Sequence, residues 1–529
     1  MLLGASLAMF GCKDEPAPAP AGDSSTGTIG SMSSGTTEAA DGGSSSGGSG
    51  ETGESPVEGA VVTHSFGSYA MAPHEEVLPC IQWTLHNEAP VYVQAVTIAN
   101  DGGFHHSNWF VVPEAYAEGP DGFYDCSERG FTELEASVSG TVLTAQSTQS
   151  RFERMDLPPG VVVKVPPFHK IVAAGHLLNL ANAEVETELR MSLDIIHPRD
   201  VEVVTAPFRL TYFDLDIPGF TEARFSGECD LESAYMTAAG GDPLDLKLYY
   251  VLPHYHYLGN YFDLTVLGGE RDGESVFRVD GFNADASGQA FPEPVDLTGA
   301  QGFRFTCGFD NWTDQTVGWG IGDQEMCVML GLADSRVLMD GSVSFGSGQV
   351  TGSEDGVLIN EGPCGVLGLA KNSEQGPPTS EEIDGPLYVP PTQPGDVDLP
   401  PVDECEDTAS DATPAGAATL GMVRDTLLVS SCQFSSCHGG STASAGLDLT
   451  ATDLHTELME HVVQANTGLP LIDPGNPEGS WLYQLVSQCA PADDSGQAVA
   501  HMPLNAPRLA DPSLVALLRD WIEAGAAND

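Results

Sequence analysis

The sequence has few basic residues. Lys and Arg together number 19 among 529 residues, against 76 Asp and Glu, so the formal net charge is −57 at pH 7. A general nucleic-acid binder neutralises phosphates with Lys and Arg, so this balance excludes that class of protein. The same shortage argues against docking on anionic lipid through a basic face. An acidic surface instead suits a soluble protein whose copies repel one another.

Long apolar runs are also missing. No run of about 18 consecutive apolar residues occurs, so the sequence predicts no membrane-spanning helix. Residues 13–55 contain only Ile29 and Met32 as large apolar residues. Such a Ser- and Gly-rich segment cannot bury enough surface to offset its ordering entropy, so we expect a disordered tether at 13–58.

The first residues form a short apolar run, MLLGASLAMFG, which is followed by Cys12. This ending resembles a bacterial lipoprotein signal, in which the cysteine carries the lipid. We therefore expect a signal at 1–12 with a lipidated Cys12, and a lipid-anchored protein of the bacterial cell envelope, periplasmic or surface-exposed. The alternative is an ordinary signal peptide in which Cys12 is incidental.

From residue 59 the sequence changes to short apolar runs, such as VYVQAVTIA at 91–99 and GVVVKV at 160–165. Gly, Pro, Asn and Asp interrupt these runs about every ten residues, which is typical of antiparallel β-sandwiches. The pattern is too long for one sandwich. It therefore predicts two in tandem, at 59–215 and at 216–370, with the boundary near 205–225, where IPGF (217–220) supplies a turn.

The stretch at 371–414 is rich in Pro and acidic residues, a composition typical of a linker. The last part, 415–529, differs in kind. It carries helical patterns at 453–465, 480–488 and 512–525. Asp511 or Pro512 would begin the last helix and Gly525 would end it. The predicted fold is mainly β, followed by a small α-helical domain.

Cysteines are few, and their distribution is informative. Cys12 aside, the first predicted sandwich holds two, the second four, and the linker with the helical part four. These are Cys80 and Cys126; Cys229, Cys307, Cys327 and Cys364; and Cys405, Cys432, Cys437 and Cys489. Even numbers in each part of an exported protein favour disulfide bonds, although these numbers leave the connectivity open.

One histidine pair in the second predicted sandwich is a candidate for metal binding. His254 and His256, in PHYHYLG, are two residues apart, so on a strand they share a face while Tyr255 points away. Surface or core histidines explain such a pair at least as often.

A second pair, His105 and His106 in GGFHHSNWF, consists of neighbours, which point in opposite directions on a regular strand. They can share an ion only at a strand end or a β-bulge, which Gly102 and Gly103 would permit.

A methionine in DNWTDQTVGWGIGDQEMCVML (310–330) supplies a possible third ligand. Met326 and Cys327 would face opposite sides of a strand. A thioether beside two imidazoles suits Cu(I) and can hold Cu(II), whereas zinc more often takes a thiolate or carboxylate. Taken alone, Met326 is better explained as a core methionine.

The order HH, H-x-H-x-x-G and C…E-M-C resembles the type II copper, ascorbate-dependent monooxygenases, the peptidylglycine α-hydroxylating and dopamine β-hydroxylating enzymes. LPPG (157–160) before HLLN (176–179), and IPGF (217–220) before Cys229, extend the resemblance over roughly residues 60–368. It implies two jelly-roll-like domains with one copper each. One copper handles electrons through three histidines; the other binds dioxygen through two histidines and a methionine and attacks a substrate C–H bond.

Carried over by position, the resemblance assigns His254, His256 and Met326 to the copper that activates dioxygen. It also implies three disulfide bonds, Cys80–Cys126, Cys307–Cys327 and Cys229–Cys364.

The electron-transfer copper would take His105, His106 and a third histidine, for which His169 and His176 are candidates. We choose His176, because HLLN resembles the run around the family's ligand, and expect His169 to be a structural or surface histidine.

The sequence departs from the family at the substrate. Leu252 stands where the peptidylglycine enzymes have an Arg that helps to bind the substrate carboxylate. Val328 and Leu330 stand where those enzymes have Asn and Tyr. The resemblance therefore implies an apolar or neutral small organic substrate rather than a peptidylglycine.

The helical part contains a motif similar to haem c attachment. Cys432, Cys437 and His438 lie in SSCQFSSCHGG, where four residues rather than the usual two separate the cysteines. Met502, in a Met-Pro context, would complete Met/His ligation of the iron, and WIEAGA (521–526) resembles bacterial cytochrome c-like domains.

The alternative is a haem-free module with a Cys432–Cys437 or Cys432–Cys489 disulfide. With haem, Cys405 and Cys489 would remain to pair. Three other histidines could serve as axial ligands, namely His455, His461 and His501.

The predicted function is a tethered copper monooxygenase with two copper ions, which hydroxylates a small organic substrate with dioxygen. Ascorbate or a redox protein would be the reductant, and a fused haem c domain would be the entry point for electrons. One alternative is a non-enzymatic copper and haem lipoprotein that transfers electrons or binds metal. Another is a surface interaction protein whose sandwiches hold no metal. Copper stoichiometry separates the three.

Overall fold

The computed structural model describes residues 59–529 apart from short gaps. The gaps are 73–74, 102, 147–151, 180–183, 257, 281–287, 312–314, 321–323, 398, 400–406, 430–431, 434–437, 440–442, 464–466, 494–495, 497–498, 500 and 503–509. The predicted signal and tether, with Cys405 and Cys437, therefore lie outside the described residues. Within the described part, no helix is long and apolar enough to cross a membrane.

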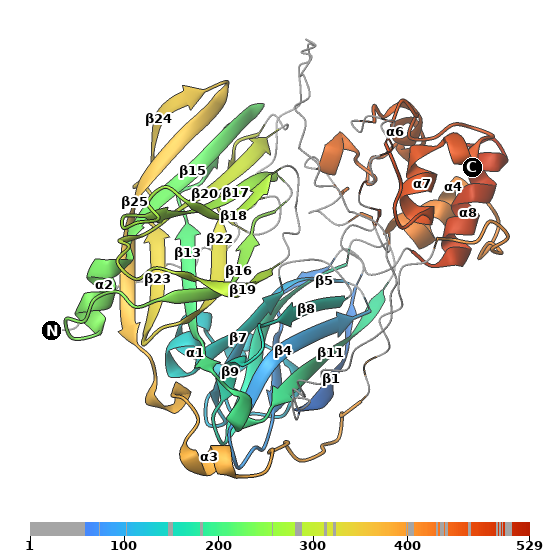
Figure 1. Cartoon of the computed structure of the whole chain (residues 1–529). Helices are drawn as coiled ribbons and strands as arrows, with labels where there is room; N and C mark the ends of the chain where they lie inside the picture. Colours follow the sequence, from blue (N-terminus) through green and yellow to red (C-terminus); the bar gives the residue numbers. More distant parts are fainter. Residues whose placement is uncertain are drawn as a thin grey trace, which may run out of the picture. The chain divides into compact units, whose positions relative to one another are not determined.

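Residues 59–204 form two sheets around one core, hereafter the first sandwich (Figure 1). As far as the chain is described, each sheet has six strands. One contains β1 (Gly59–Met71), β11 (Val185–Ile196), β4 (Val91–Asn100), β9 (Val161–Val165) and β12 (Val203–Val204), with β8 (Phe152–Asp156) beside β4. The other contains β6 (Gly122–Tyr124), β3 (Cys80–Thr84), β10 (His169–Leu178), β5 (Phe104–Pro113) and β7 (Thr141–Gln146), with β2 (Glu76–Val77) beside β10. Both sheets fill the core, with Ile98 and Leu193 from one and Trp83 and Trp109 from the other.

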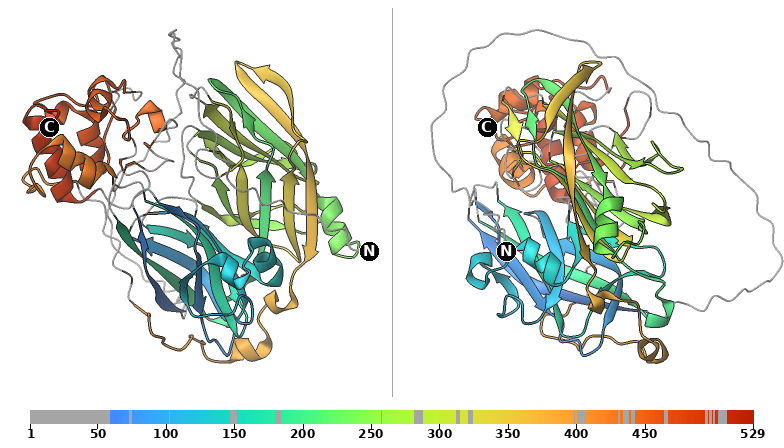
Figure 2. Two further views of the ribbon diagram at one scale, coloured as in Figure 1. Left: turned by 180° about the vertical axis from the view of Figure 1, so that it is seen from behind. Right: turned by 90° about the vertical axis from the view of Figure 1, so that its left-hand side faces the viewer.

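Residues 206–370 form the second β-domain, in which the described strands make one sheet of eleven (Figure 2). Its order is β18 (Ser275–Asp280), β17 (Gly259–Leu267), β20 (Gly302–Asn311), β15 (Thr221–Asp230), β25 (Val357–Ala370), β23 (Val337–Val343), β13 (Ala206–Tyr212), β22 (Val328–Asp334), β16 (Lys247–His254) and β19 (Gln289–Asp296), with β24 (Gln349–Glu354) beside β25. Two short strands, β14 (Asp216–Ile217) and β21 (Val317–Gly318), pair separately, and one helix, α2 (Leu231–Ala238), follows β15. Leu264, Phe305 and Met329 come from different parts of the sheet and bury in one core.

The border between the two β-domains lies at the lower end of the predicted range, 205–225. β13 pairs with β22 and β23, so the second β-domain already begins at residue 206. The boundary predicted between residues 215 and 216 therefore lies inside the second β-domain. A turn motif such as IPGF marks the end of a strand, but it does not show which sheet the strand joins.

Disulfide connectivity agrees with the pairs that the resemblance implies. The described cysteines form Cys80–Cys126, Cys229–Cys364 and Cys307–Cys327. Cys229 and Cys364 lie opposite each other on the adjacent strands β15 and β25. Cys489 is also disulfide-bonded, to a cysteine outside the described residues.

Residues 372–397, hereafter the strap, lie along the first sandwich and contain the helix α3 (Ser380–Asp384). The hydrogen bonds between strap and sandwich include Lys164 Nζ to Gly376 O, Tyr92 Oη to Glu382, His197 Nε2 to Gly385 O, Glu88 N to Tyr388 Oη, Gln393 Nε2 to Leu85 O and Ser65 N to Gly395 O. The predicted linker at 371–414 is therefore ordered along its first half. A segment without periodicity can be held in this way, because a neighbouring sheet satisfies its backbone polar groups.

The last part of the chain, hereafter the helical domain, contains α4 (Leu420–Val423), α6 (Leu454–Glu460), α7 (Trp481–Ser487) and α8 (Pro512–Glu523). The orange and red helices of Figure 1 share one apolar core. The three predicted helices are confirmed. Asp511 caps α8 by accepting from Ser513 N, and Gly525 follows its end with a φ of 102°. The patterns at 453–465, 480–488 and 512–525 missed α4, which continues into a π-helical turn at Arg424–Leu428.

Loss of the two disulfides of the second β-domain should destabilise it unequally. The bond between Cys229 and Cys364 spans 135 residues, whereas the bond between Cys307 and Cys327 spans 20. Loop entropy therefore predicts that replacing the first pair with Ala costs about 5 kcal/mol and replacing the second about 3 kcal/mol. Denaturant unfolding of the two double variants measures both values, and a larger cost for the shorter loop would contradict this account.

Candidate metal centre

The first sandwich contributes His106 and His176 from neighbouring strands. His106 on β5 lies directly opposite His176 on β10, and the ring centroids are 4.8 Å apart. The pairing shifts after this point, because Leu177 pairs with Phe104 and leaves His105 as the extra residue of a bulge. The irregularity predicted at this histidine pair is therefore present. The direction of the His105 side chain lies outside the described part of the structure.

The second β-domain contributes His254, the last residue of β16, and His256 in the loop that follows. The two ring centroids lie 5.2 Å apart, while Tyr255 between them is buried in the domain's own core. The sequence expectation that this pair converges is thus confirmed, although His256 lies beyond the strand end. Nδ1 of His256 donates to the backbone oxygen of Gln324 (2.6 Å), which leaves the lone pair on Nε2.

The histidines of the two β-domains meet. The ring of His106 is 5.1 Å from that of His254 and 6.3 Å from that of His256. One ligand nitrogen from each of these three residues lies within 4.8 Å of the other two. His176 adjoins this triad through His106. Two sets that the sequence assigns to separate copper ions therefore form one cluster.

Two carboxylates hold the cluster in position. Nε2 of His176 donates to Glu76 (2.6 Å), so its Nδ1 keeps the lone pair, an arrangement that orients metal-ligating histidines in many proteins. The fully buried Glu325 accepts backbone N–H groups from His256 (2.8 Å) and Leu258 (2.7 Å). It therefore fixes the loop that carries His256.

Met326 follows Glu325 directly and is partly exposed, while Cys327 is buried and bonded to Cys307. Neighbouring residues thus face opposite sides, as expected. Pairing of β16 with β22 ends at His254 opposite Val328, so Met326 lies just beyond the same strand end as the histidines. The backbone of Met326 is therefore close to that of His254 in the fold.

Burial keeps the two histidines of the second β-domain neutral. It lowers the pKa of His254 to about 3 and that of His256 to about 4, with nearby imidazoles lowering both further. Neutral imidazole is the form that binds a metal. Imidazole nitrogens are donors that suit copper and other late first-row ions.

His169 lies at the other end of β10 and is buried in the first sandwich. Its Nδ1 donates to Pro167 O (2.8 Å). Because β10 rises about 3.4 Å per residue, His169 is more than about 20 Å along the strand from His176.

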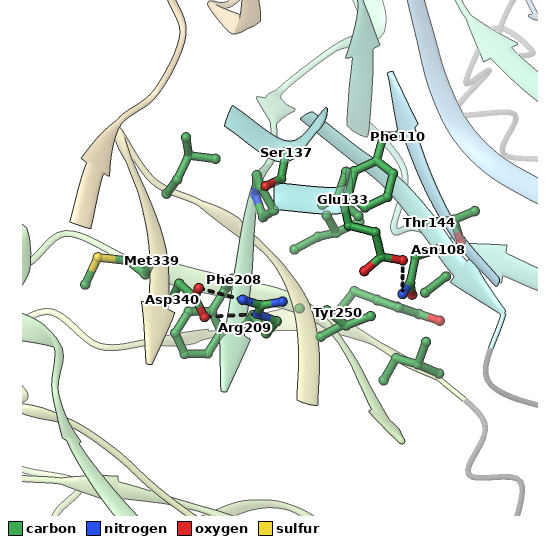
Figure 3. A pocket seen from close by; sticks show the side chains of 18 of the residues that line it. Asn108, Phe110, Glu133, Ser137, Thr144, Phe208, Arg209, Tyr250, Met339 and Asp340 are labelled. Atoms are coloured by element: carbon green, nitrogen blue, oxygen red, sulfur yellow. Dashed lines mark hydrogen bonds and ion pairs between the residues drawn. The ribbon is translucent and has the colours of Figure 1, made fainter. Parts of the chain in front are cut away.

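A pocket of about 300 Å³ adjoins the cluster, between the outer face of the first sandwich and that of the second β-domain (Figure 3). Most of its lining is apolar. The first sandwich contributes Phe110, Val142 and Met155 together with α1 (Glu133–Ser139), and the second β-domain contributes Tyr250, Leu252, Leu330, Leu332 and Leu369.

Strand alternation explains why the pocket and the histidines are neighbours. On β5 the outward residues are His106, then Asn108 and Phe110, and the last two line the pocket. On β16 Leu252 lines the pocket and His254 follows on the same face. The pocket therefore begins about 7 Å along either strand from a histidine of the cluster.

Polar groups in the pocket form two pairs. Arg209 donates twice to Asp340, at 3.0 and 2.7 Å, and Asn108 donates to Glu133 at 3.0 Å (Figure 3). Burial raises the pKa of Glu133, although Asn108 and the charge of Arg209 oppose the rise.

Several of these residues escaped sequence reasoning. Glu325 carried a usable signal, since it precedes Met326 in the E-M-C run. No sequence signal pointed to Arg209 and Asp340. These two residues are 131 positions apart, and only the parallel pairing of β13 with β23 brings them into contact.

The haem-like motif lies partly outside the described residues, which omit Cys437. Cys432 is a free thiol buried in the core of the helical domain, where burial raises its pKa to about 12. His438 N donates to Cys432 O (3.1 Å), and Met502 packs against the same core. Both disulfide alternatives that involve Cys432 are therefore wrong.

Comparisons with known proteins give no assignment. No family model matches the chain, and no curated protein matches it. A chain from the cowpea mosaic virus top component, which consists of naturally occurring empty particles, aligns with 53% of this chain and 89% of its own, at 10% identity and a TM-score of 0.25. The VP2 subviral particle of infectious bursal disease virus aligns with 53% and 73%, at 10% identity and a TM-score of 0.14. Likenesses this weak determine neither fold nor function.

Replacing Glu133 should change the pH dependence of stability. A carboxyl whose pKa rises on folding loses stability as pH increases above its ordinary value of 4.5, because the unfolded chain releases the proton first. Glu133→Gln should therefore stabilise the protein at pH 7 relative to wild type, with little effect at pH 4. Thermal unfolding at both pH values measures this. The matched control is Glu135→Gln, which changes an exposed residue on the same helix. Equal effects of the two variants on stability would argue against burial as the cause of the raised Glu133 pKa.

Proposed function

We propose that this protein is a copper-dependent monooxygenase that hydroxylates a C–H bond of a small, apolar organic molecule with dioxygen. The observation that carries the proposal is the convergence of His106, His254 and His256 from two β-domains, with ligand nitrogens within 4.8 Å of one another. The resemblance to the type II copper monooxygenases selected all three residues as copper ligands. The three disulfide bonds that it implied provide independent support.

The ligand roles follow the resemblance. His254, His256 and Met326 would hold the copper that activates dioxygen, and His105, His106 and His176 the copper that handles electrons. When bound, copper would supply one-electron redox chemistry and the activation of dioxygen. The two β-domains would then be the jelly-roll-like domains of that family.

The chain's own side chains provide positioning and exclusion of water. Glu325 holds the His256 loop through backbone N–H groups, and Glu76 orients His176. Leu252 and Leu330 line the pocket where related enzymes have Arg and Tyr. A substrate there would meet hydrocarbon on most sides, so binding would rest on burial of apolar surface rather than on a carboxylate contact.

Hydroxylation of one C–H bond by dioxygen consumes two electrons, which an external reductant must supply. Ascorbate is one source. We propose a second, a haem c in the helical domain attached to Cys432 and Cys437 with His438 and Met502 as axial ligands, which would make this domain cytochrome c-like. The specific observation in favour is that Cys432 is a free thiol beside His438.

The position of the strap supports the delivery of electrons from the helical domain. The strap ends on the first sandwich, where Asp396 lies 3.5 Å from His64. The chain that leads to the helical domain therefore starts from the domain that carries His106, which raises the effective concentration of an electron donor near it. A lipid anchor at Cys12 would place the protein in the bacterial envelope, where haem c is attached.

The function is tested by oxygen consumption. Copper-reconstituted protein with ascorbate should take up more oxygen when pools of small apolar compounds are added. Met326→Ile should reduce the stimulated uptake to background, because loss of the thioether destabilises Cu(I). His169→Ala, in a buried histidine far along β10, is the matched control and should retain it. Full activity of copper-loaded Met326→Ile would refute the ligand assignment, and copper binding without stimulated uptake would favour the non-enzymatic alternative.

The haem proposal has its own test. Co-expression with haem c maturation proteins should yield covalent haem with a c-type visible spectrum, and Cys432→Ala should reduce the haem yield because one thioether is lost. The control is His86→Ala, which changes an exposed histidine of the first sandwich. Protein matured without covalent haem would eliminate the electron-entry role of the helical domain.

A further inference from the structure

We propose that the two β-domains share a single metal ion, bound by His106 of the first sandwich together with His254 and His256 of the second β-domain. This site differs from the two separate copper sites of the proposed function. It also requires no hydroxylation chemistry, because any late first-row divalent ion that prefers imidazole can occupy it.

Distances favour one shared site over two. His106 is about as far from His254 (5.1 Å between ring centroids) as from its strand partner His176 (4.8 Å). Metal–imidazole bonds of about 2.0–2.1 Å place the nitrogens of a tetrahedral set roughly 3.3 Å apart. The triad, with nitrogens within 4.8 Å, reaches that separation through small side-chain movements.

The number of ligands also fits one ion. The triad offers one nitrogen from each of three histidines, and three protein ligands are enough for many sites that hold a single ion.

The arrangement of the strands gives the ion a structural consequence. His106 is fixed by the pairing of β5 with β10, and His254 by the pairing of β16 with β22. The backbone of neither histidine can move far unless its strand shifts within its own sheet. An ion shared by these residues therefore links the two β-domains, and its binding energy adds to the apolar contact of Tyr250, Leu252 and Leu332 with the first sandwich.

The test uses the full-length chain and a metal alone. Co²⁺ is titrated into metal-free protein and followed by visible absorption, which reports coordination by nitrogen. We expect one tight equivalent. His106→Ala and His254→Ala, one in each β-domain, should each weaken that equivalent by more than about a hundredfold, since even an outer-shell partner contributes roughly 10- to 100-fold.

His176→Ala is the discriminating control, because His176 adjoins His106 but lies outside the triad. It should keep the first equivalent within about tenfold. Zn²⁺ should raise the unfolding temperature of wild type and His176→Ala but not of His106→Ala or His254→Ala. A cooperative unfolding transition of each metal-free variant confirms that the variant is folded. If a variant does not fold, His106→Gln is used in its place.

Separate sites would give a different result. The protein would then bind two independent equivalents of Co²⁺. Replacing His106 or His176 would remove one equivalent, and replacing His254 or His256 would remove the other. This result refutes the shared site and leaves the proposed function standing. Failure of wild type to bind Co²⁺ would refute the shared site and leave the copper-dependent function to its own oxygen-uptake test. One shared equivalent without oxygen uptake would support the shared site and refute the hydroxylase.

Discussion

The apolar contact between the outer faces of the two β-domains is the constraint on which the candidate site depends. Tyr250, Leu252 and Leu332 turn away from their own core and bury in that of the first sandwich. Burying such side chains contributes about 1.5–3 kcal/mol each, whereas bringing histidines together contributes nothing by itself. Because side chains alternate along a strand, His254 must follow Leu252 onto the same face, where it meets His106. The histidine cluster is therefore a consequence of hydrophobic packing next to it.

Rigid supports complete the site on the side of the second β-domain. The bond between Cys307 and Cys327 ties β20 to the segment before β22, and Glu325 ties that segment to the His256 loop. The loop lies beyond the last paired residue of β16, so strand hydrogen bonds do not hold it. One covalent bond and one buried carboxyl replace them. This explains how a loop residue can be as well positioned as a strand residue.

The lining of the pocket is mostly hydrocarbon. Leu252 and Leu330 contribute to it from the adjacent strands β16 and β22. The charges that remain, on Arg209, Asp340 and Glu133, are engaged with protein partners. In a chain with a net charge of −57, a pocket lined in this way favours neutral, apolar molecules over anions. The chemistry of the pocket thus follows from a few side chains on the outer faces of the two β-domains.

The sequence by itself determined the mainly β character of residues 59–370, the three helices after residue 450, the disulfide pairs through the family resemblance, and the identity of the histidines. These features depend on local periodicity, capping and motif order, which a chain displays residue by residue. Only the tertiary structure decided that β13 belongs to the second β-domain, that the strap follows the first sandwich, and that Arg209 pairs with Asp340. It alone also brought His106 and His254 together as one cluster. These relations join positions more than a hundred residues apart through sheet register and domain packing, and neither periodicity nor spacing along the chain records which faces meet.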